Sequence, residues 1–299
     1  MADTEPVGEP EIKLTKVPSG KDGKFSIGTH ARDERGGRGY QMAEPSPYVE
    51  QWAQCYNGKQ PLMDIGCAYG MNTEAAVKVL DSADDDASKV KILAADFDST
   101  HLQYVNNLKM AGVSTVHCKL PMELPVVEVE RYGGLSGILV SEVLHFLTGS
   151  EIESSLSWFY SCLIPGGKVF ITACSPYMGG EVLDKCRPEI LALRREGLKK
   201  GLKWPLSPDD SFTPLFAWCK EDSEEKKEID EKLGMGIDIS SFWSKTVHML
   251  EWELVDACRD AGFQVVEAKL AWREGYHELA RGDGREGIRI IARKPNDDV

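Results

Sequence analysis

The chain has 299 residues, of which 42% are hydrophobic, and its formal net charge is −13. This length accommodates one large α/β domain with an insertion, or two small domains. An acidic surface repels phosphates, so DNA or RNA is disfavoured as the main partner, although residues 32–38 are locally basic. No membrane partner is expected, because no apolar run approaches the roughly 18 residues of a membrane span. The polar, acidic start lacks a signal-peptide pattern, so the expected location is the cytoplasm.

The cysteines follow neither a metal-binding nor a redox pattern. There are eight of them, and none lies closer than 12 residues to the next. This spacing excludes Cys-x-x-Cys, so no metal site is expected, and we interpret the cysteines as reduced, buried thiols. They are Cys55, Cys67, Cys118, Cys162, Cys174, Cys186, Cys219 and Cys258.

An irregular or disordered tail is expected over 1–39, which is rich in Gly, Lys, Glu, Asp and Pro and has few apolar residues. A short helix is predicted next, over 47–56. Strand and helix patterns then alternate, which is typical of a parallel sheet covered by helices. The predicted strands are 61–65, 91–96, 113–118, 137–141 and 168–173, and the helices between them are 73–80, 99–110 and 151–163.

The alternation stops near Pro176, and residues 178–245 form an insertion with helical segments and a charged run at 221–232. Pro188 suits the first turn of a helix and Gly201 suits its end. We interpret this insertion as a cap or lid.

The alternating pattern resumes with a predicted helix at 249–261 and two strands at 263–272 and 287–293. The sequence therefore predicts an α/β fold with a doubly wound, mostly parallel, seven-stranded sheet and an inserted helical cap. The core of this fold comprises residues 40–177 and 246–299.

A glycine loop directly follows the first core strand, with the spacing Asp64-x-Gly66-x-x-x-Gly70. Glycine lets a ligand approach the backbone, and ligands of open α/β sheets bind beyond the carboxyl ends of the strands. The Gly-x-Gly-x-x-Gly of a dinucleotide site is absent. A carboxylate before the loop disfavours a pyrophosphate and favours a cationic cofactor. The same residues also fit an ordinary tight turn between a strand and a helix.

A second acidic residue, Asp96, closes the second core strand. A carboxylate there can bind both ribose hydroxyls of a nucleoside, and Phe97 is placed to lie on an adenine face. The alternative role of Asp96 is to cap the next helix, but Asp98 and Ser99 suit that role better.

Together these segments resemble the motifs of class I S-adenosylmethionine-dependent methyltransferases. The matching segments are 64–70, 95–102, 141–147 and 163–171, followed by a helix-turn-strand at 254–266. The resemblance covers residues 45–177 and 246–295, and it implies a Rossmann-like fold, S-adenosyl-L-methionine as the cofactor and methyl transfer as the activity. The cofactor contacts that it implies are Asp64, Gly66, Ala68, Gly70, Asp96, Phe97, Leu120 and Ser141.

Three positions depart from the family pattern. Ala68 stands where the family often has glycine, which narrows the loop beside the methionine moiety. The segment 118–120 replaces an acidic residue that contacts the adenine amino group, so the backbone near Leu120 must serve instead. Ser136 stands where the fourth strand usually begins with Asp.

Catalysis by an activated sulfonium requires mainly that the acceptor be aligned and water excluded. His145 lies near the expected methyl site and can act as a base, or it is a core histidine. Tyr177, after the fifth strand, either bounds the acceptor pocket or only packs. Tyr40, with Arg38, closes over the methionine carboxylate or belongs to the tail. Tyr69 can face the sulfonium through its ring.

The acceptor is expected to be a small molecule, because an inserted cap would roof the acceptor site. The aromatic residues of the insertion either line that site or form the core of the cap. They are Trp204, Phe212, Phe216, Trp218, Phe242 and Trp243. The alternatives are a protein or peptide methyltransferase, and a partner protein that binds the cofactor without turnover.

Overall fold

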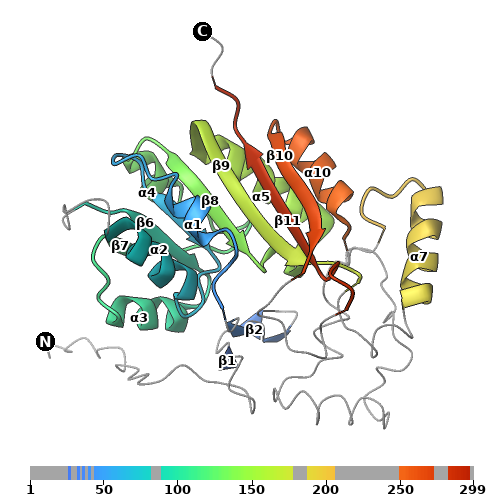
Figure 1. Cartoon of the computed structure of the whole chain (residues 1–299), viewed down its shortest axis with the longest axis horizontal. Coiled ribbons are helices and arrows are strands. Elements are labelled where there is room, and N and C mark those ends of the chain that lie inside the picture. The colour runs from blue at the N-terminus through green and yellow to red at the C-terminus, as the bar shows by residue number, and fades with distance from the viewer. Residues whose placement is uncertain are drawn as a thin grey trace, which may run out of the picture.

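The protein is built on a seven-stranded sheet with the strand order β10-β11-β9-β8-β5-β6-β7 (Figure 1). The strands are β5 (Leu62–Ile65), β6 (Ile92–Asp96), β7 (Val113–His117), β8 (Leu135–Ser141), β9 (Leu163–Cys174), β10 (Gln264–Ala271) and β11 (Gly287–Arg293). Strands β5 to β9 run parallel to one another, and β11 is antiparallel to both of its neighbours. The predicted doubly wound, mostly parallel sheet is therefore confirmed.

This computed structural model describes residues 44–81, 89–177, 187–205, 249–272 and 282–296, together with four two-residue strands between 26 and 41. Its helices are α1 (Val49–Ala53), α2 (Met71–Asp81), α3 (Ser99–Asn107), α4 (Val126–Arg131), η1 (Leu144–Phe146), α5 (Gly149–Cys162), α7 (Arg187–Lys199) and α10 (Glu251–Asp260). None of the helices in these ranges is both long and apolar enough to cross a membrane.

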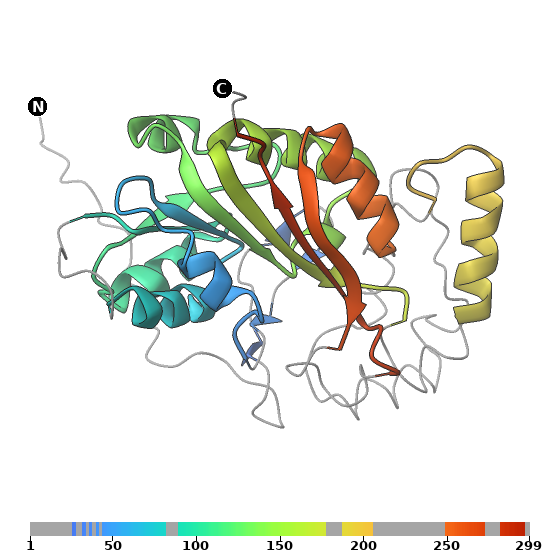
Figure 2. The same cartoon turned by 45° about the horizontal axis from the view of Figure 1, so that its top comes forward.

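Helices cover both faces of the sheet, as Figures 1 and 2 show. Alternate strand residues point to opposite faces, so each strand contributes to two clusters. Met63 and Leu93 pack with residues of α5 and α10 in the larger cluster. Leu62 and Ile92 pack on the other face, with residues of α1 and α2. The sheet is thus buried between two helical layers.

Local capping fixes where two of the covering helices begin. The Asp98 carboxylate accepts a hydrogen bond from the Thr100 amide at the start of α3. At the start of α5, the Thr148 hydroxyl accepts from the Glu151 amide while the Glu151 carboxylate accepts from the Thr148 amide. The predicted cap of α3 by Asp98 is confirmed, and Asp96 is free of that role.

Several predicted boundaries differ from the structure. Helix α4 was not predicted, because its sequence carries no polar capping residue before Val126. Strand β9 begins at Leu163 instead of Lys168, since Leu163 already pairs with Leu135 ahead of a bulge. Within the tail, which the sequence predicts to be mostly irregular, the structure describes short paired strands: β1 (Ser26–Ile27) with β4 (Tyr40–Gln41), and β2 (Arg32–Asp33) with β3 (Gly36–Gly37).

The described part of the insertion, residues 187–205, consists of α7 and the turn that follows it. Trp204 packs tightly on Gly149 of α5, and its indole N–H donates to the Glu153 carboxylate at 2.9 Å. Trp204 therefore packs on the main domain. The other aromatic residues of the insertion and the charged run 221–232 lie outside the described residues.

Candidate functional site

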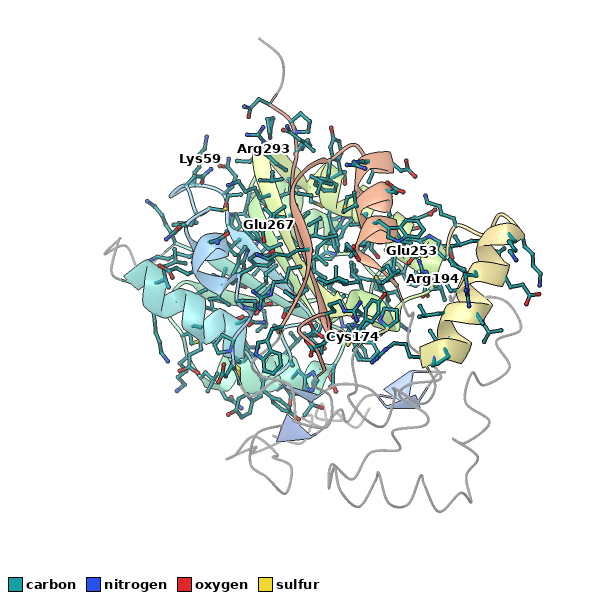
Figure 3. All side chains as sticks on the ribbon, turned by 45° about the vertical axis from the view of Figure 1, so that its right-hand side comes forward. Lys59, Cys174, Arg194, Glu253, Glu267 and Arg293 are labelled. Carbon is teal, nitrogen blue, oxygen red and sulfur yellow. The ribbon has the colours of Figure 1, made fainter. Side chains whose placement is uncertain are left out.

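The site lies at the carboxyl edge of the sheet, where β5, β6, β8 and β9 end together. Ile65 of β5 lies beside Val140 of β8, and Ser141 lies beside Thr172 of β9. The strand order reverses between β5 and β8, and a crevice at such a reversal is where open α/β sheets bind their ligands. Cys174, labelled in Figure 3, marks this edge at the end of β9.

The glycine loop between β5 and α2 is shaped by left-handed backbone at Gly66, Ala68 and Gly70, with φ of 70°, 46° and 83°. A Cβ atom at Gly66 would lie 2.4 Å from Cγ2 of Val143, so the position admits only glycine. The Gly66 and Cys67 amides both donate to the Ala95 carbonyl, at 2.8 and 3.0 Å. The end of β6 therefore holds the start of the loop in place.

Asp64 is a fully buried carboxylate at the base of this loop. The Thr73 hydroxyl donates to its Oδ2 at 2.7 Å, while Oδ1 has no hydrogen-bond partner among the described residues. Burial raises the pKa of Asp64 to about 7, and the nearby Asp96 carboxylate contributes to that rise. A buried carboxylate oxygen without a donor fits a cationic ligand group.

Asp96 fastens the glycine loop to the end of β6. The Ala68 amide donates to its Oδ2 and the Asp98 amide to its Oδ1, both at 2.9 Å. His101 Nδ1 lies 3.3 Å from Oδ1, and Asp96 is only 4% exposed. Each carboxylate oxygen can accept more than one hydrogen bond. The ribose contact stays a prediction, and the structure adds a second role for Asp96, that of holding the loop.

Tyr69 packs against α3, and its expected ring contact with the sulfonium stays a prediction. Its side chain is buried, and its ring packs edge-on against His101 and Tyr104 of α3, with centroids 4.7 and 5.3 Å apart. Tyr69 thus packs the loop onto α3.

The remaining predicted cofactor residues lie around the same edge. Phe97 is half-buried directly after β6, and Leu120 is buried in the larger core cluster. The Ser141 hydroxyl lies 3.1 Å from that of Thr172 at the ends of β8 and β9. Tyr40 belongs to the short strand β4, where it pairs with Ile27. Their contacts with a cofactor stay predictions, as does the backbone role assigned to Leu120.

His145 is buried in η1, at the end of the segment that follows β8. Its Nδ1 lies 3.4 Å from the amide nitrogen of Cys174, and its Nε2 lies 3.7 Å from the Cys174 sulfur. His145 is therefore at the expected edge of the sheet, but its ring faces β9 and not an open surface.

Sequence reasoning missed two residues beside His145, namely Glu142 and Cys174. The Cys174 thiol lies 3.5 Å from Oε2 of Glu142, and these side chains and His145 can each bring one ligand atom within 4.8 Å of the others. Glu142 has a left-handed backbone, with φ of 60°, which is costly for a residue other than glycine. The signal for Glu142 was present in the motif 141–147, but nothing in the sequence pairs it with Cys174.

Tyr177 follows β9 and lies between two guanidinium groups. The Arg285 guanidinium carbon is 4.0 Å from the centre of its ring, and that of Arg187 is 5.6 Å away. Arg187 also donates to the Tyr177 carbonyl at 3.4 Å. These contacts fix the ring at the rim of the edge where β9 ends and β11 begins, and its role toward an acceptor stays a prediction.

No family model and no curated protein matches this sequence. Among solved structures, the chain is similar to an S-adenosylmethionine-dependent methyltransferase from Methanosarcina mazei, with 12% identity, 85% of this chain and 100% of that chain covered, and a TM-score of 0.47. It is similar to another from Archaeoglobus fulgidus, at 12% identity, 82% and 91% coverage and a TM-score of 0.45. A third, TehB-like enzyme from Corynebacterium glutamicum has 12% identity, 83% and 89% coverage and a TM-score of 0.43.

Proposed function

We propose that the chain is an S-adenosylmethionine-dependent methyltransferase that acts on a small-molecule acceptor. The observation that carries this proposal is Asp64 at the base of a glycine loop, whose fully buried Oδ1 has no donor among the described residues. A buried, unpaired carboxylate is costly unless a ligand pairs it. The cationic amino group of the cofactor supplies such a partner, whereas a pyrophosphate would be repelled.

The residues around Asp64 fit the rest of the cofactor. Gly66 brings bare backbone to the end of β5, and Asp96 lies one strand away, with its Oδ2 accepting from the Ala68 amide of the loop. Asp64 would bind the amino group, Asp96 the ribose and Phe97 the adenine. The bound cofactor supplies a methyl group on a sulfonium. The acceptor attacks the methyl carbon in line, and the cofactor sulfur is the leaving group. The protein's part is to align the acceptor and exclude water.

The acceptor side of the site supports a small molecule. His145 and Cys174 are buried, so a reacting group must enter among buried side chains, and Tyr177 with its two arginines stands at the rim. We keep the cytoplasm as the proposed location, because the six cysteines in the described ranges form no disulfide.

Calorimetric titration with S-adenosylhomocysteine tests cofactor binding through Asp64→Asn. The substitution keeps the shape and the Thr73 contact but removes the charge, so the dissociation constant should rise about 10- to 100-fold. Asp256→Asn, on the exposed side of α10, is the matched control and should bind like the native protein. Equal affinity in a folded Asp64→Asn variant would refute the assignment.

The acceptor class is tested by incubating the protein with labelled S-adenosylmethionine and a cell extract divided by molecular size. Label should enter the small-molecule fraction. Label confined to proteins would replace the proposed acceptor with a peptide, and binding without any transfer would make the chain a cofactor-binding partner.

A further inference from the structure

Three side chains of different chemistry converge beside the glycine loop: the Glu142 carboxylate, the His145 imidazole and the Cys174 thiol. Sulfur is 3.5 Å from the Glu142 Oε2 and 3.7 Å from the His145 Nε2, and one ligand atom from each residue lies within 4.8 Å of the others. Glu142 immediately follows β8, and Cys174 is the last residue of β9. Two neighbouring strands and η1 therefore build the cluster.

The two separations that involve sulfur match the edges of a metal-binding tetrahedron. Zinc binds cysteine sulfur at about 2.3 Å, histidine nitrogen at about 2.0–2.1 Å and carboxylate oxygen at about 2.0–2.2 Å. At tetrahedral angles, those lengths place sulfur about 3.5–3.6 Å from the nitrogen and from the oxygen. The two observed distances from sulfur differ from these by about 0.2 Å or less, and the ligand atoms of Glu142 and His145 lie within 4.8 Å of each other. A side-chain movement of Glu142 or His145 would close the site around an ion.

We propose that Glu142, His145 and Cys174 bind one zinc-class divalent ion, whose fourth position accepts the ionisable S–H or O–H group of the acceptor. One sulfur, one nitrogen and one oxygen ligand suit borderline-soft Zn²⁺ and disfavour Mg²⁺ and Ca²⁺, which prefer oxygen. Three protein ligands with an open fourth position are the arrangement of catalytic zinc sites.

The place of the cluster connects it to the proposed methyl transfer, and the acceptor part of the inference rests on that proposed function. Val143, next to Glu142, lies against Gly66, so the ion would lie close to the glycine loop. An acceptor S–H or O–H bound to the ion would release its proton to water. The resulting anion would then attack the methyl carbon, and the carbon–sulfur bond would break with its electron pair passing to the cofactor sulfur.

Metal binding requires one local rearrangement. Nε2 of His145 can bind a cation only if Nδ1 carries the ring proton, yet the Cys174 amide points at Nδ1 from 3.4 Å. That distance is at the long end for a hydrogen bond, so the hydrogen bond is weak and its loss costs little free energy. We therefore expect the Cys174 amide resonance to shift when the ion binds.

The test uses the full chain, stripped of metal and reduced, and titrated with Zn²⁺ in competition with a chromophoric chelator, and separately with Co²⁺. One equivalent should bind tightly, and Co²⁺ should produce a sulfur-to-cobalt charge-transfer band in the near ultraviolet. Cys174→Ser should abolish the band and weaken binding at least 100-fold. Cys55→Ser, at the opposite end of the sheet from the cluster, is the matched control and should change neither.

Glu142→Gln provides a second reading if Cys174→Ser fails to fold. It should weaken Zn²⁺ binding while keeping the charge-transfer band, because the sulfur ligand remains. A folded native protein that binds no more Zn²⁺ than Cys174→Ser would overturn the proposal and leave the three side chains as a hydrogen-bonded cluster only.

The acceptor class is read with 2-mercaptoethanol and phenol as probes of the Co²⁺ protein. A thiol acceptor site should gain charge-transfer intensity with 2-mercaptoethanol, whereas a hydroxyl site should change its visible bands with phenol. If neither probe changes the spectrum, the proposal of an open fourth position is refuted. Titration with S-adenosylhomocysteine separates the two proposals, because metal binding without cofactor binding refutes the proposed function alone, and the reverse refutes the metal site alone.

Discussion

Glu142 combines a strained backbone with a side chain directed at the site. A left-handed conformation costs about 1–3 kcal/mol for residues other than glycine, and Glu142 adopts it with φ of 60°. Its amide donates to the Thr172 carbonyl at 2.8 Å, which holds the strained residue against the end of β9. A strained backbone at Glu142 is consistent with a site that requires its carboxylate in one particular position.

The strain predicts an unusual order of stabilities at residue 142. Glu142→Gly and Glu142→Ala both remove the carboxylate, but only glycine relieves the backbone. Glycine should therefore be the more stable variant by about 1 kcal/mol, after its greater freedom in the unfolded chain is subtracted. Urea unfolding of the two variants measures this difference. If Glu142→Ala is at least as stable as Glu142→Gly, the left-handed backbone carries no cost in stability at this position.

At the scale of single residues, the sequence could predict only groups of residues that lie close together in the chain. Asp64, Gly66 and Gly70 lie within one short segment, so their spacing alone indicated the loop. Cys174 and Glu142 are 32 positions apart, and only the pairing of β8 with β9 joins them. The packing of Tyr69 could not be predicted for a related reason, because its partners His101 and Tyr104 belong to a helix whose packing the loop sequence does not encode.

Among the elements, α7 is attached to α10 by a buried ion pair between Arg194 and Glu253 (Figure 3). The two groups are 2.5 Å apart, and both side chains are almost completely buried. The Glu253 carboxylate also accepts from the Leu250 amide at 2.7 Å, where α10 begins. Burial raises the pKa of Glu253, while Arg194 acts against that rise. The first part of the insertion is thus anchored to the main domain.

This anchor predicts that α7 behaves as part of the core. Arg194→Met should lower the free energy of unfolding by about 3–5 kcal/mol, because it leaves a buried carboxylate without its partner. The double variant Arg194→Met with Glu253→Met should recover most of that loss. Hydrogen exchange should show α7 losing protection in the single variant while α2 keeps its own. A loss below 1 kcal/mol would show that the pair contributes little to holding α7.

The sequence predicted α7 from Pro188 and Gly201, and the helix runs from Arg187 to Lys199. It could not predict which surface the helix would contact, because Arg194 and Glu253 are distant in the chain. The interpretation of residues 178–245 as a cap or lid stays a prediction, and within it the described residues 187–205 are anchored to the main domain.

At the scale of the whole molecule, one buried carboxylate couples stability to pH. The pKa of Asp64 is raised from its ordinary 3.8 to about 7, so the folded state favours the protonated form. The stability that this group contributes is full below about pH 4 and is lost as the pH rises to about 7. Above that pH, the ionised group costs on the order of 4 kcal/mol. A bound cation offsets this cost.

Ligand stabilisation should therefore depend on pH. S-adenosylhomocysteine at about 100 times its dissociation constant should stabilise the fold by about 2.7 kcal/mol at pH 8. At pH 5.5 the carboxyl must first lose a proton, which weakens binding about 30-fold and reduces the shift in Tm. Thermal unfolding at both pH values measures the shift in Tm that the ligand causes. In Asp64→Asn, we expect this shift to be nearly the same at the two pH values. Equal shifts in the native protein would remove Asp64 from the cofactor site.

The antiparallel placement of β11 between β9 and β10 bears on how the chain is completed during its synthesis. Strands β5 to β9 can pair as they leave the ribosome, but β10 has no neighbour until residues 287–293 arrive. Until then, β9 presents an open edge and β10 a second one, both of which invite pairing with other chains. Strand β11 inserts between them and covers the open edge of β9 and the facing edge of β10 in one step. Ribosome stalling just before β11 would thus produce the most aggregation-prone form of the nascent protein.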